Sequence, residues 1–128
     1  MPPPPHSYII RIVNQMHEYS ITESVLSLAL EKAREARATK IIRINLVLGE
    51  LSGVVSESVR QCFEVLGKDT IARDAVFSFE MKPTSLRCRP CDRVFSPSDY
   101  TWACPDCGQL SVEIASGQEC YMESIEVE

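Results

Sequence analysis

Two short cysteine pairs are the feature of this 128-residue chain that most constrains its fold. The first pair is Cys88-Arg-Pro-Cys91, the second is Cys104-Pro-Asp-Cys107, and the residues from Asp92 to Ala103 separate them. A tight turn within each Cys-x-x-Cys pair directs both thiolates toward one point, and two facing pairs supply the four soft ligands of a tetrahedral Zn2+ site. The spacing predicts a structural zinc ribbon, because a closed four-thiolate site leaves no open position for catalysis.

Three other uses of these cysteines stand beside the zinc ribbon. A pair of disulfides would suit a small secreted protein, but no signal peptide opens the chain, and Cys62 and Cys120 occupy ordinary interior positions. A thioredoxin-type redox dithiol draws support from the nearby Trp102, but that chemistry needs one Cys-x-x-Cys that opens a helix. An iron site of rubredoxin geometry uses the same four thiolates, and the sequence does not separate it from zinc.

The charge balance bears on what such a ribbon would bind. The chain carries 13 Lys and Arg against 18 Asp and Glu residues, for a net charge of −5. A protein surface that binds nucleic acid needs positive charge to neutralise the phosphates, so we expect no nucleic-acid partner for this acidic chain. The local basic patch of Arg87, Arg89 and Arg93 is the one feature that favours such a partner. No apolar run reaches the roughly 18–20 residues that span a bilayer. Reduced thiols without a signal peptide or membrane segment predict a cytoplasmic protein.

Hydrophobic periodicity predicts two helices. Ser20 and Glu23 form a capping box for a helix that runs to about Ala38. Ser56 is the expected cap of a second helix over about 57–68. The apolar face of this second helix carries Val59, Cys62, Phe63 and Leu66. We expect Cys62 to be a small core residue.

Three further runs predict strands. Ile41–Leu48 alternates, with Ile42, Ile44, Leu46 and Leu48 expected on one buried side. Ala75–Met81 and Glu119–Val127 are the other two, and the last is expected to return and pair with the earlier strands. The predicted fold class is therefore α+β, with two helices on a small, mainly antiparallel sheet and an inserted, rubredoxin-like zinc ribbon.

The predicted division of the chain follows from these elements. Residues 16–85 and 113–128 form the α+β domain, and residues 86–112 form the zinc ribbon, in which Tyr100 and Trp102 are expected to pack over the cysteine pairs. Residues 1–15 are an N-terminal extension that opens with the proline run Pro2–Pro5 and continues with a stretch of weak strand character.

An ordered set of motifs resembles one known family. Met16-His17-Glu18 precedes the first helix, Leu48-Gly49-Glu50-Leu51-Ser52-Gly53-Val54-Val55 follows the first strand, and Glu57-Ser58 and the paired cysteines come after it. In this order they resemble the HypA/HybF family of hydrogenase maturation factors. The resemblance implies a nickel metallochaperone for nickel–iron hydrogenase, built from an α+β nickel-binding domain and a zinc ribbon. It also implies a HypB-type GTPase and the hydrogenase large-subunit precursor as partners, with a homodimer as an open option.

The resemblance assigns metals to particular residues. His17 is implied as the imidazole ligand of a transient Ni2+, with Glu18 as a supporting ligand, and Cys88, Cys91, Cys104 and Cys107 as the ligands of a structural Zn2+. An imidazole suits Ni2+, which accepts nitrogen-rich planar or octahedral sites. Read without the family, Glu18 is simply an acid favoured near a helix N-terminus.

The chain departs from the family pattern at its start. Met16 is not the first residue, so the amine that would help to bind nickel belongs to Met1, beyond four prolines. Either translation begins at Met16, which we favour, or the extension is real and backbone groups or His6 join His17 and Glu18 around nickel. No Ser-His-Asp set, P-loop or open zinc triad is visible, so we expect no enzyme. The rivals are a zinc-ribbon interaction module for nucleic acid or transcription machinery and a thiol redox protein.

Overall fold

The structure, a computed structural model, describes residues 8–9, 18–98 and 100–128, so Met16 and His17 lie outside the described residues. Helix α1 (Glu18–Glu35) is amphipathic, with buried residues recurring every three or four positions. These residues are Ile21, Thr22, Val25, Leu26, Ala29 and Ala33. All of them except Thr22 belong to one continuous hydrophobic core together with residues of the second helix and the main sheet.

The predicted ends of this helix are wrong. An N-cap residue lies just outside its helix, but Ser20 lies inside α1, so it forms no capping box with Glu23. Near this end the Thr22 hydroxyl instead donates to the carbonyl oxygen of Glu18 at 2.6 Å. At the other end the chain turns through Arg37, whose φ is 55°, and the N–H of Ala38 donates to the carbonyl of Ala33. This left-handed residue with its six-to-one bond ends the helix before Ala38.

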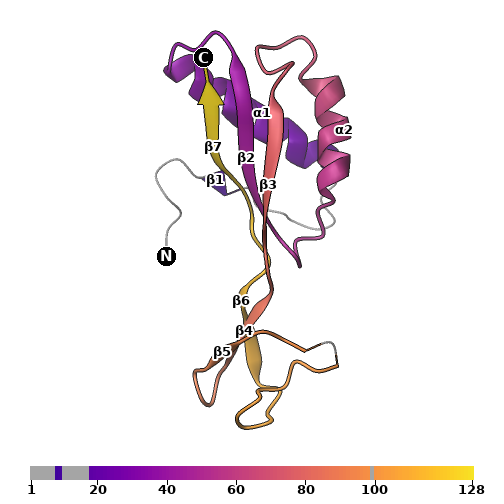
Figure 1. The fold of residues 1–128 in the computed structure, drawn as a ribbon, viewed down its shortest axis with the longest axis vertical. Helices are drawn as coiled ribbons and strands as arrows, with labels where there is room; N and C mark the ends of the chain where they lie inside the picture. Colours follow the sequence, from indigo (N-terminus) through magenta and orange to yellow (C-terminus); the bar gives the residue numbers. More distant parts are fainter. Residues whose placement is uncertain (1–7, 10–17, 99) are drawn as a thin grey trace.

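The main sheet has the strand order β1-β7-β2-β3, with β1 (Tyr8–Ile9), β2 (Ile41–Gly49), β3 (Val76–Lys82) and β7 (Cys120–Val127). Strand β7 pairs antiparallel with both β1 and β2, so the predicted return of the last strand is confirmed. Strands β2 and β3 run parallel, because helix α2 supplies the crossover between them. The structure confirms the predicted α+β class (Figure 1).

The alternation predicted for β2 holds only in part. Ile44, Leu46 and Leu48 are buried as expected, but Ile42 is 42 % exposed while Ile41 is fully buried. The register between β2 and β7 shifts between Ile41 and Arg43, which marks a bulge at Ile42. Because a bulge inserts one residue into the alternation, it turns Ile42 away from the core and Ile41 toward it.

Helix α2 (Ser56–Leu66) packs beside α1 on the core side of the sheet. Its N-cap is Val55, which makes no side-chain capping bond, so the predicted cap at Ser56 is wrong. Phe63 anchors the helix, since its ring centroid lies 4.5 Å from that of Phe77 on β3 in an edge-on arrangement. Cys62 is only half-buried, beside the fully packed Val59 and Phe63.

A second, smaller sheet carries the cysteine pairs. It has the order β5-β4-β6, with β4 (Ser85–Cys88), β5 (Val94–Phe95) and β6 (Val112–Ser116). It lies at the end of the elongated molecule away from the helices (Figure 1). Its core is small, and its buried residues are Leu86, Cys88, Phe95 and Cys104. Neither α1 nor α2 is long and apolar enough to cross a membrane.

Candidate metal centre

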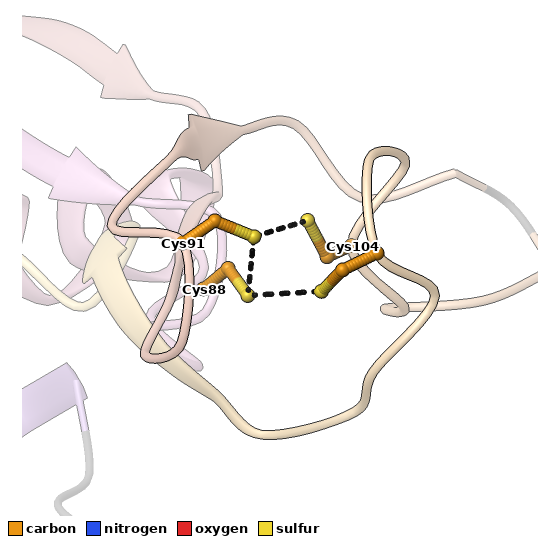
Figure 2. Close-up of side chains that lie close together, drawn as sticks. Cys88, Cys91 and Cys104 are labelled. Carbon is orange, nitrogen blue, oxygen red and sulfur yellow. Dashed lines mark hydrogen bonds between the residues drawn. The ribbon is translucent and has the colours of Figure 1, made fainter.

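The four predicted zinc ligands meet at one point. The Sγ atoms of Cys88, Cys91, Cys104 and Cys107 all lie within 4.8 Å of one another. Figure 2 shows the first pair facing the second, with sulfur separations of 3.4 Å (Cys88 to Cys91), 3.6 Å (Cys88 to Cys107) and 3.7 Å (Cys91 to Cys104). Four sulfurs at about 2.3 Å from a tetrahedral zinc ion lie about 3.8 Å apart, so the donor set fits zinc.

Each cysteine pair is built by the same backbone turn. In the first, the N–H of Cys88 donates to the carbonyl of Arg93, and the N–H of Asp92 donates back to the carbonyl of Cys88 at 2.7 Å. In the second, the N–H of Cys104 donates to the carbonyl of Gln109, and the N–H of Gly108 donates back to the carbonyl of Cys104 at 2.8 Å. The two cysteine pairs of the site therefore arise from one local backbone geometry that is used twice.

The left-handed position just after each pair completes this turn. It is filled by Asp92 (φ 59°) in the first and by Gly108 (φ 72°) in the second. A Cβ on Gly108 would meet no atom within 4 Å, so the backbone angle and not the space explains glycine there. Both pairs are thus held open toward the same point by sequence-local constraints.

The surroundings shift the pKa values of Cys104 and Cys91 in opposite directions. The backbone N–H of Cys107 donates to the Sγ of Cys104 and lowers the pKa of that thiol to about 7, with a further contribution from the N–H of Asp106. The pKa of Cys91 is raised, chiefly because its thiol is hydrogen-bonded to Cys107. Four thiolates this close repel one another, and a divalent cation that takes the place of their protons removes the repulsion.

The geometry argues against two of the three other uses of these cysteines, the disulfides and the redox dithiol. All six cysteines are free, and the shortest separation within the cluster, 3.4 Å, is far from the roughly 2.05 Å of a disulfide bond. Neither pair opens a helix, since Cys88 ends β4 and the second pair lies in a turn, so a thioredoxin-type site is not favoured. An iron site would use the same four sulfurs and is not separated from zinc by this geometry.

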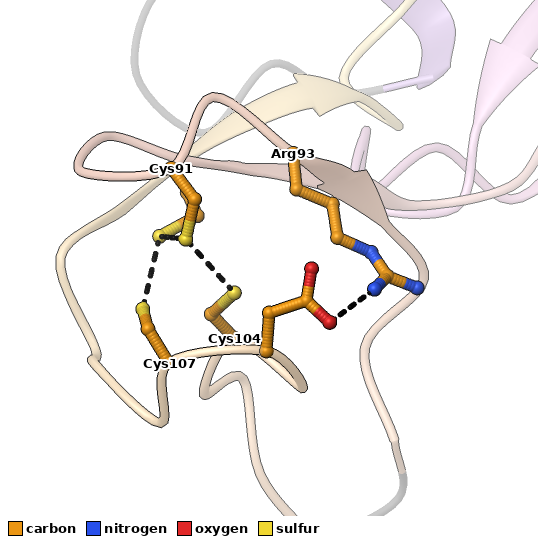
Figure 3. Close-up of polar contacts among 6 residues, drawn as sticks. Cys91, Arg93, Cys104 and Cys107 are labelled. Atoms are coloured by element: carbon orange, nitrogen blue, oxygen red, sulfur yellow. Dashed lines mark hydrogen bonds and ion pairs between the residues drawn. The ribbon is translucent and has the colours of Figure 1, made fainter.

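Charged side chains tie the two cysteine pairs together. Arg93, which follows the first pair, forms an ion pair with Asp106, which lies within the second (Figure 3). This contact was not predicted, because the cysteine spacing predicts that the two turns face each other but not which of their charged side chains meet. The other arginines of the basic patch also have acidic partners. A guanidinium nitrogen of Arg87 lies 3.2 Å from a carboxylate oxygen of Asp92, and the Nε atoms of Arg87 and Arg89 each lie 3.9 Å from a carboxylate oxygen of Glu113. The patch therefore offers little free positive charge to phosphate.

The predicted packing of Tyr100 over the cysteine pairs is wrong. Tyr100 is 97 % exposed, and Trp102 is 41 % exposed. Leu86 and Phe95, which the sequence did not single out, fill the module's core instead. They share a register position, since Leu86 of β4 pairs with Phe95 of β5, and this pairing was not visible before the strands were placed.

The predicted nickel ligands lie at the boundary of the described residues. His17 and the alternative ligand His6 lie outside them. Glu18 is the first residue of α1 and is half-buried, and its carbonyl accepts the Thr22 hydroxyl. Its position suits both a metal ligand next to His17 and a carboxylate at a helix N-terminus.

Comparison with known proteins decides the family. The family described as "Hydrogenase/urease nickel incorporation, metallochaperone, hypA" matches residues 16–127. This span includes the Met-His-Glu triplet and both cysteine pairs. The chain belongs to the HypA family.

Individual HypA proteins agree with this assignment. The chain is 46 % identical over 113 residues to the hydrogenase maturation factor HypA of Dehalococcoides mccartyi strain 195, a match that covers 88 % of this chain and 95 % of that protein. It is 39 % identical over 114 residues to HypA of Caldanaerobacter subterraneus, covering 88 % of this chain and all of the relative.

Solved HypA structures share the fold. The solution structure of the nickel metallochaperone HypA from Helicobacter pylori superposes with a TM-score of 0.63 at 30 % identity, covering 88 % of this chain and 97 % of that one. A second HypA solution structure superposes with a TM-score of 0.71 at 30 % identity, and the match covers 90 % of this chain and 98 % of that one.

Family membership confirms the predicted function class. The chain is a nickel metallochaperone of hydrogenase maturation and not an enzyme, and its role places it with the hydrogenase maturation machinery. The four-cysteine cluster fits the structural zinc site expected of the HypA family. The rival interaction with nucleic acid is not favoured, in agreement with the neutralised basic patch.

Proposed function

We propose that this chain carries two metals in separate places, a structural Zn2+ on the four cysteines and a transported Ni2+ at His17, with Glu18 as a supporting ligand. The observation that carries the proposal is the closed cluster of four thiols in a chain of a nickel-carrying family. Zinc held by four thiolates has no open coordination position, so an ion that must be received and released needs another site.

The chemistry of the N-terminal segment supports it as that other site. His17 directly precedes the first residue of α1, and an imidazole with neighbouring amide nitrogens suits the planar or octahedral preference of Ni2+. Because the imidazole must be neutral to bind, nickel loading is expected to weaken below the pKa of the histidine. The zinc, when bound, supplies the fold of the small module and no chemistry of transfer.

The partners and setting follow from the maturation role. We propose a HypB-type GTPase and the hydrogenase large-subunit precursor as partners in the cytoplasm, with a homodimer as a further possibility for delivery. Pull-down of each purified partner by the zinc-loaded chain, with and without nickel, tests the two heterologous contacts, and light scattering tests the dimer.

A nickel titration with matched variants tests the site. The chain has only two histidines, so His17→Ala and His6→Ala separate the proposed ligand from its alternative. The expected result is about one Ni2+ per parent chain, binding lost in His17→Ala and kept in His6→Ala, and zinc content unchanged in both. Nickel binding by His17→Ala equal to that of the parent would refute the assignment.

The two possible starts of the chain are separated by intact mass. If translation begins at Met16, the natively expressed protein lacks residues 1–15; if the extension is real, the mass is the full 14.4 kDa. In the longer form nickel is expected to bind with different affinity, because the free amine then stands 15 residues before Met16.

A further inference from the structure

The small module joins the α+β domain through two single crossings of the chain. One runs from β3 to β4 through Pro83 and Thr84, and the other runs from β6 to β7 through residues 117–119. These residues belong to neither sheet, and they form the narrow waist of the molecule (Figure 1). A two-stranded connection twists and bends readily, so the orientation of the module must be set by further contacts.

The turn at the end of β2 touches both crossings. The N–H of Glu50 donates to the carbonyl of Lys82 at 2.9 Å, just before the first crossing. The N–H of Leu51 donates to the carbonyl of Gly117 at 2.6 Å, inside the second. A third chain segment is thereby inserted between the two strands that lead to the module.

The carboxylate of Glu50 makes the most specific of these contacts. Its Oε2 accepts both the backbone N–H and the Oγ1 hydroxyl of Thr84, each at 2.9 Å. Thr84 is only 7 % exposed, and its N–H lies in the gap between β3 and β4, where no strand partner is available. Glu50 thus accepts a hydrogen bond from the buried N–H of Thr84, which has no partner in either sheet because strand pairing is interrupted between β3 and β4. The same N–H, followed by the hydroxyl, holds the pKa of Glu50 below its usual range.

Other side chains satisfy the remaining groups of the waist. The Ser116 hydroxyl donates to the carbonyl of Pro83 at 2.9 Å, and a carboxylate oxygen of Glu119 accepts the N–H of Gly117 at 2.7 Å. Because the Ser116 hydroxyl has only one hydrogen, the 2.6 Å contact between Ser85 and Ser116 must have Ser85 as its donor. The crossings are therefore hydrogen-bonded to each other and to β2.

The backbones at the waist also approach too closely to slide freely. A Cβ on Gly49 would lie 2.0 Å from the carbonyl oxygen of Gly117. Gly117 itself has φ of 120°, and a Cβ there would lie 3.1 Å from Thr84. Both positions require glycine, one for the close crossing and one for the backbone angle.

We propose that Glu50 is a positioning residue, whose carboxylate fixes the four-cysteine module in one orientation relative to the α+β domain by holding Thr84. Two charged residues border the crossings, Lys82 at the end of β3 and Glu119 in the second crossing, and neither takes the place of Glu50, since Lys82 pairs with Glu80 and Glu119 accepts from Gly117. A movement of the module that carries Thr84 away from the end of β2 must break the two bonds between Glu50 and Thr84. This inference does not depend on the nickel assignment.

Residual dipolar couplings of the zinc-loaded full chain test the proposal. In the parent, one alignment tensor is expected to fit the amides of both the module and the α+β domain. In Glu50→Ala the magnitude of the alignment tensor fitted to the module is expected to be about twofold or more smaller than that fitted to the domain, because reorientation of the module averages its couplings. Glu50→Gln, which keeps an accepting oxygen without the charge, is expected to fall between them.

Matched variants separate positioning from a general loss of stability. Thr84→Val removes the hydroxyl and is expected to loosen the module, whereas Thr84→Ser keeps both donors and restores the parental tensor. Glu64→Ala removes an exposed carboxylate of α2, and no change is expected. If Glu50→Ala does not fold, the Thr84 pair carries the test. A single parental tensor in both Glu50→Ala and Thr84→Val, or an equal loosening in Glu64→Ala, would overturn the proposal.

Discussion

Removal of zinc is expected to unfold the small module and leave the α+β domain folded. Among the described residues of the module, the core has two buried apolar side chains that are not ligands, Leu86 and Phe95. Burial of such side chains stabilises by about 1.5–3 kcal/mol each, or about 3–6 kcal/mol together. Structural zinc in small cysteine modules contributes about 10–16 kcal/mol, so the metal and not the core decides whether residues 85–116 fold.

Hydrogen exchange with and without a strong zinc chelator measures this difference segment by segment. The amides of Cys104 and Gly108 report on the module, because they donate to carbonyls of their own turn. Ile44 and Leu46, buried at the centre of β2, report on the domain. A decrease of about 4 kcal/mol in the free energy of opening of the module would already lower the protection of its amides about a thousandfold, while the amides of β2 keep their protection.

Two outcomes would refute this reasoning. Protection at Cys104 and Gly108 that survives complete removal of zinc would show that the small apolar core suffices. Simultaneous loss of protection at Ile44 would show that the two parts of the chain fold as one unit. Cys88→Ser, which removes one of the four thiolates, provides the same comparison without a chelator.

Two further predictions concern the α+β domain. Phe63→Ala removes the ring that packs at 4.5 Å on Phe77 and is expected to lower the free energy of unfolding by about 3–5 kcal/mol in a denaturant titration. Val65→Ala, at a position 72 % exposed on the same helix, serves as the control and is expected to change it by no more than about 0.5 kcal/mol. The folded pKa of Glu50 is depressed from 4.5, so its contribution to stability is full above that value and is lost as pH falls through the folded pKa. Glu50→Gln is therefore expected to weaken the pH dependence of stability on the acid side, and an unchanged acid limb in thermal unfolding from pH 6 to 3 would contradict it.

The meeting of the four cysteines was predictable from sequence because its determinants are local. Each Cys-x-x-Cys pair folds into the same turn with bonds that reach no farther than five residues, as between Cys88 and Arg93. The spacer then has only to bring two identical turns face to face. The left-handed position after the second pair is likewise local, since it is filled by Gly108, a residue that adopts it without strain, whereas Asp92 fills it after the first.

The errors share a different cause. Ile42 was placed in the core because alternation was followed through a bulge that only the pairing of β2 with β7 creates. Ser20 was taken as a cap because the motif is present, but α1 begins at Glu18 and passes through it. Tyr100 was expected to pack over the cysteine pairs, but Leu86 and Phe95 already fill the module's core. The contact of Glu50 with Thr84 spans 34 positions and had no local signal.

The central claim is that the transported nickel and the structural zinc occupy different ligands. Nickel K-edge X-ray absorption on the zinc-loaded chain with one equivalent of Ni2+ tests it most directly. The account predicts nitrogen and oxygen neighbours around nickel, no thiolate sulfur, and zinc retained on its four cysteines. Thiolate sulfur around nickel together with released zinc would contradict it, because nickel would then have entered the cluster of Cys88, Cys91, Cys104 and Cys107.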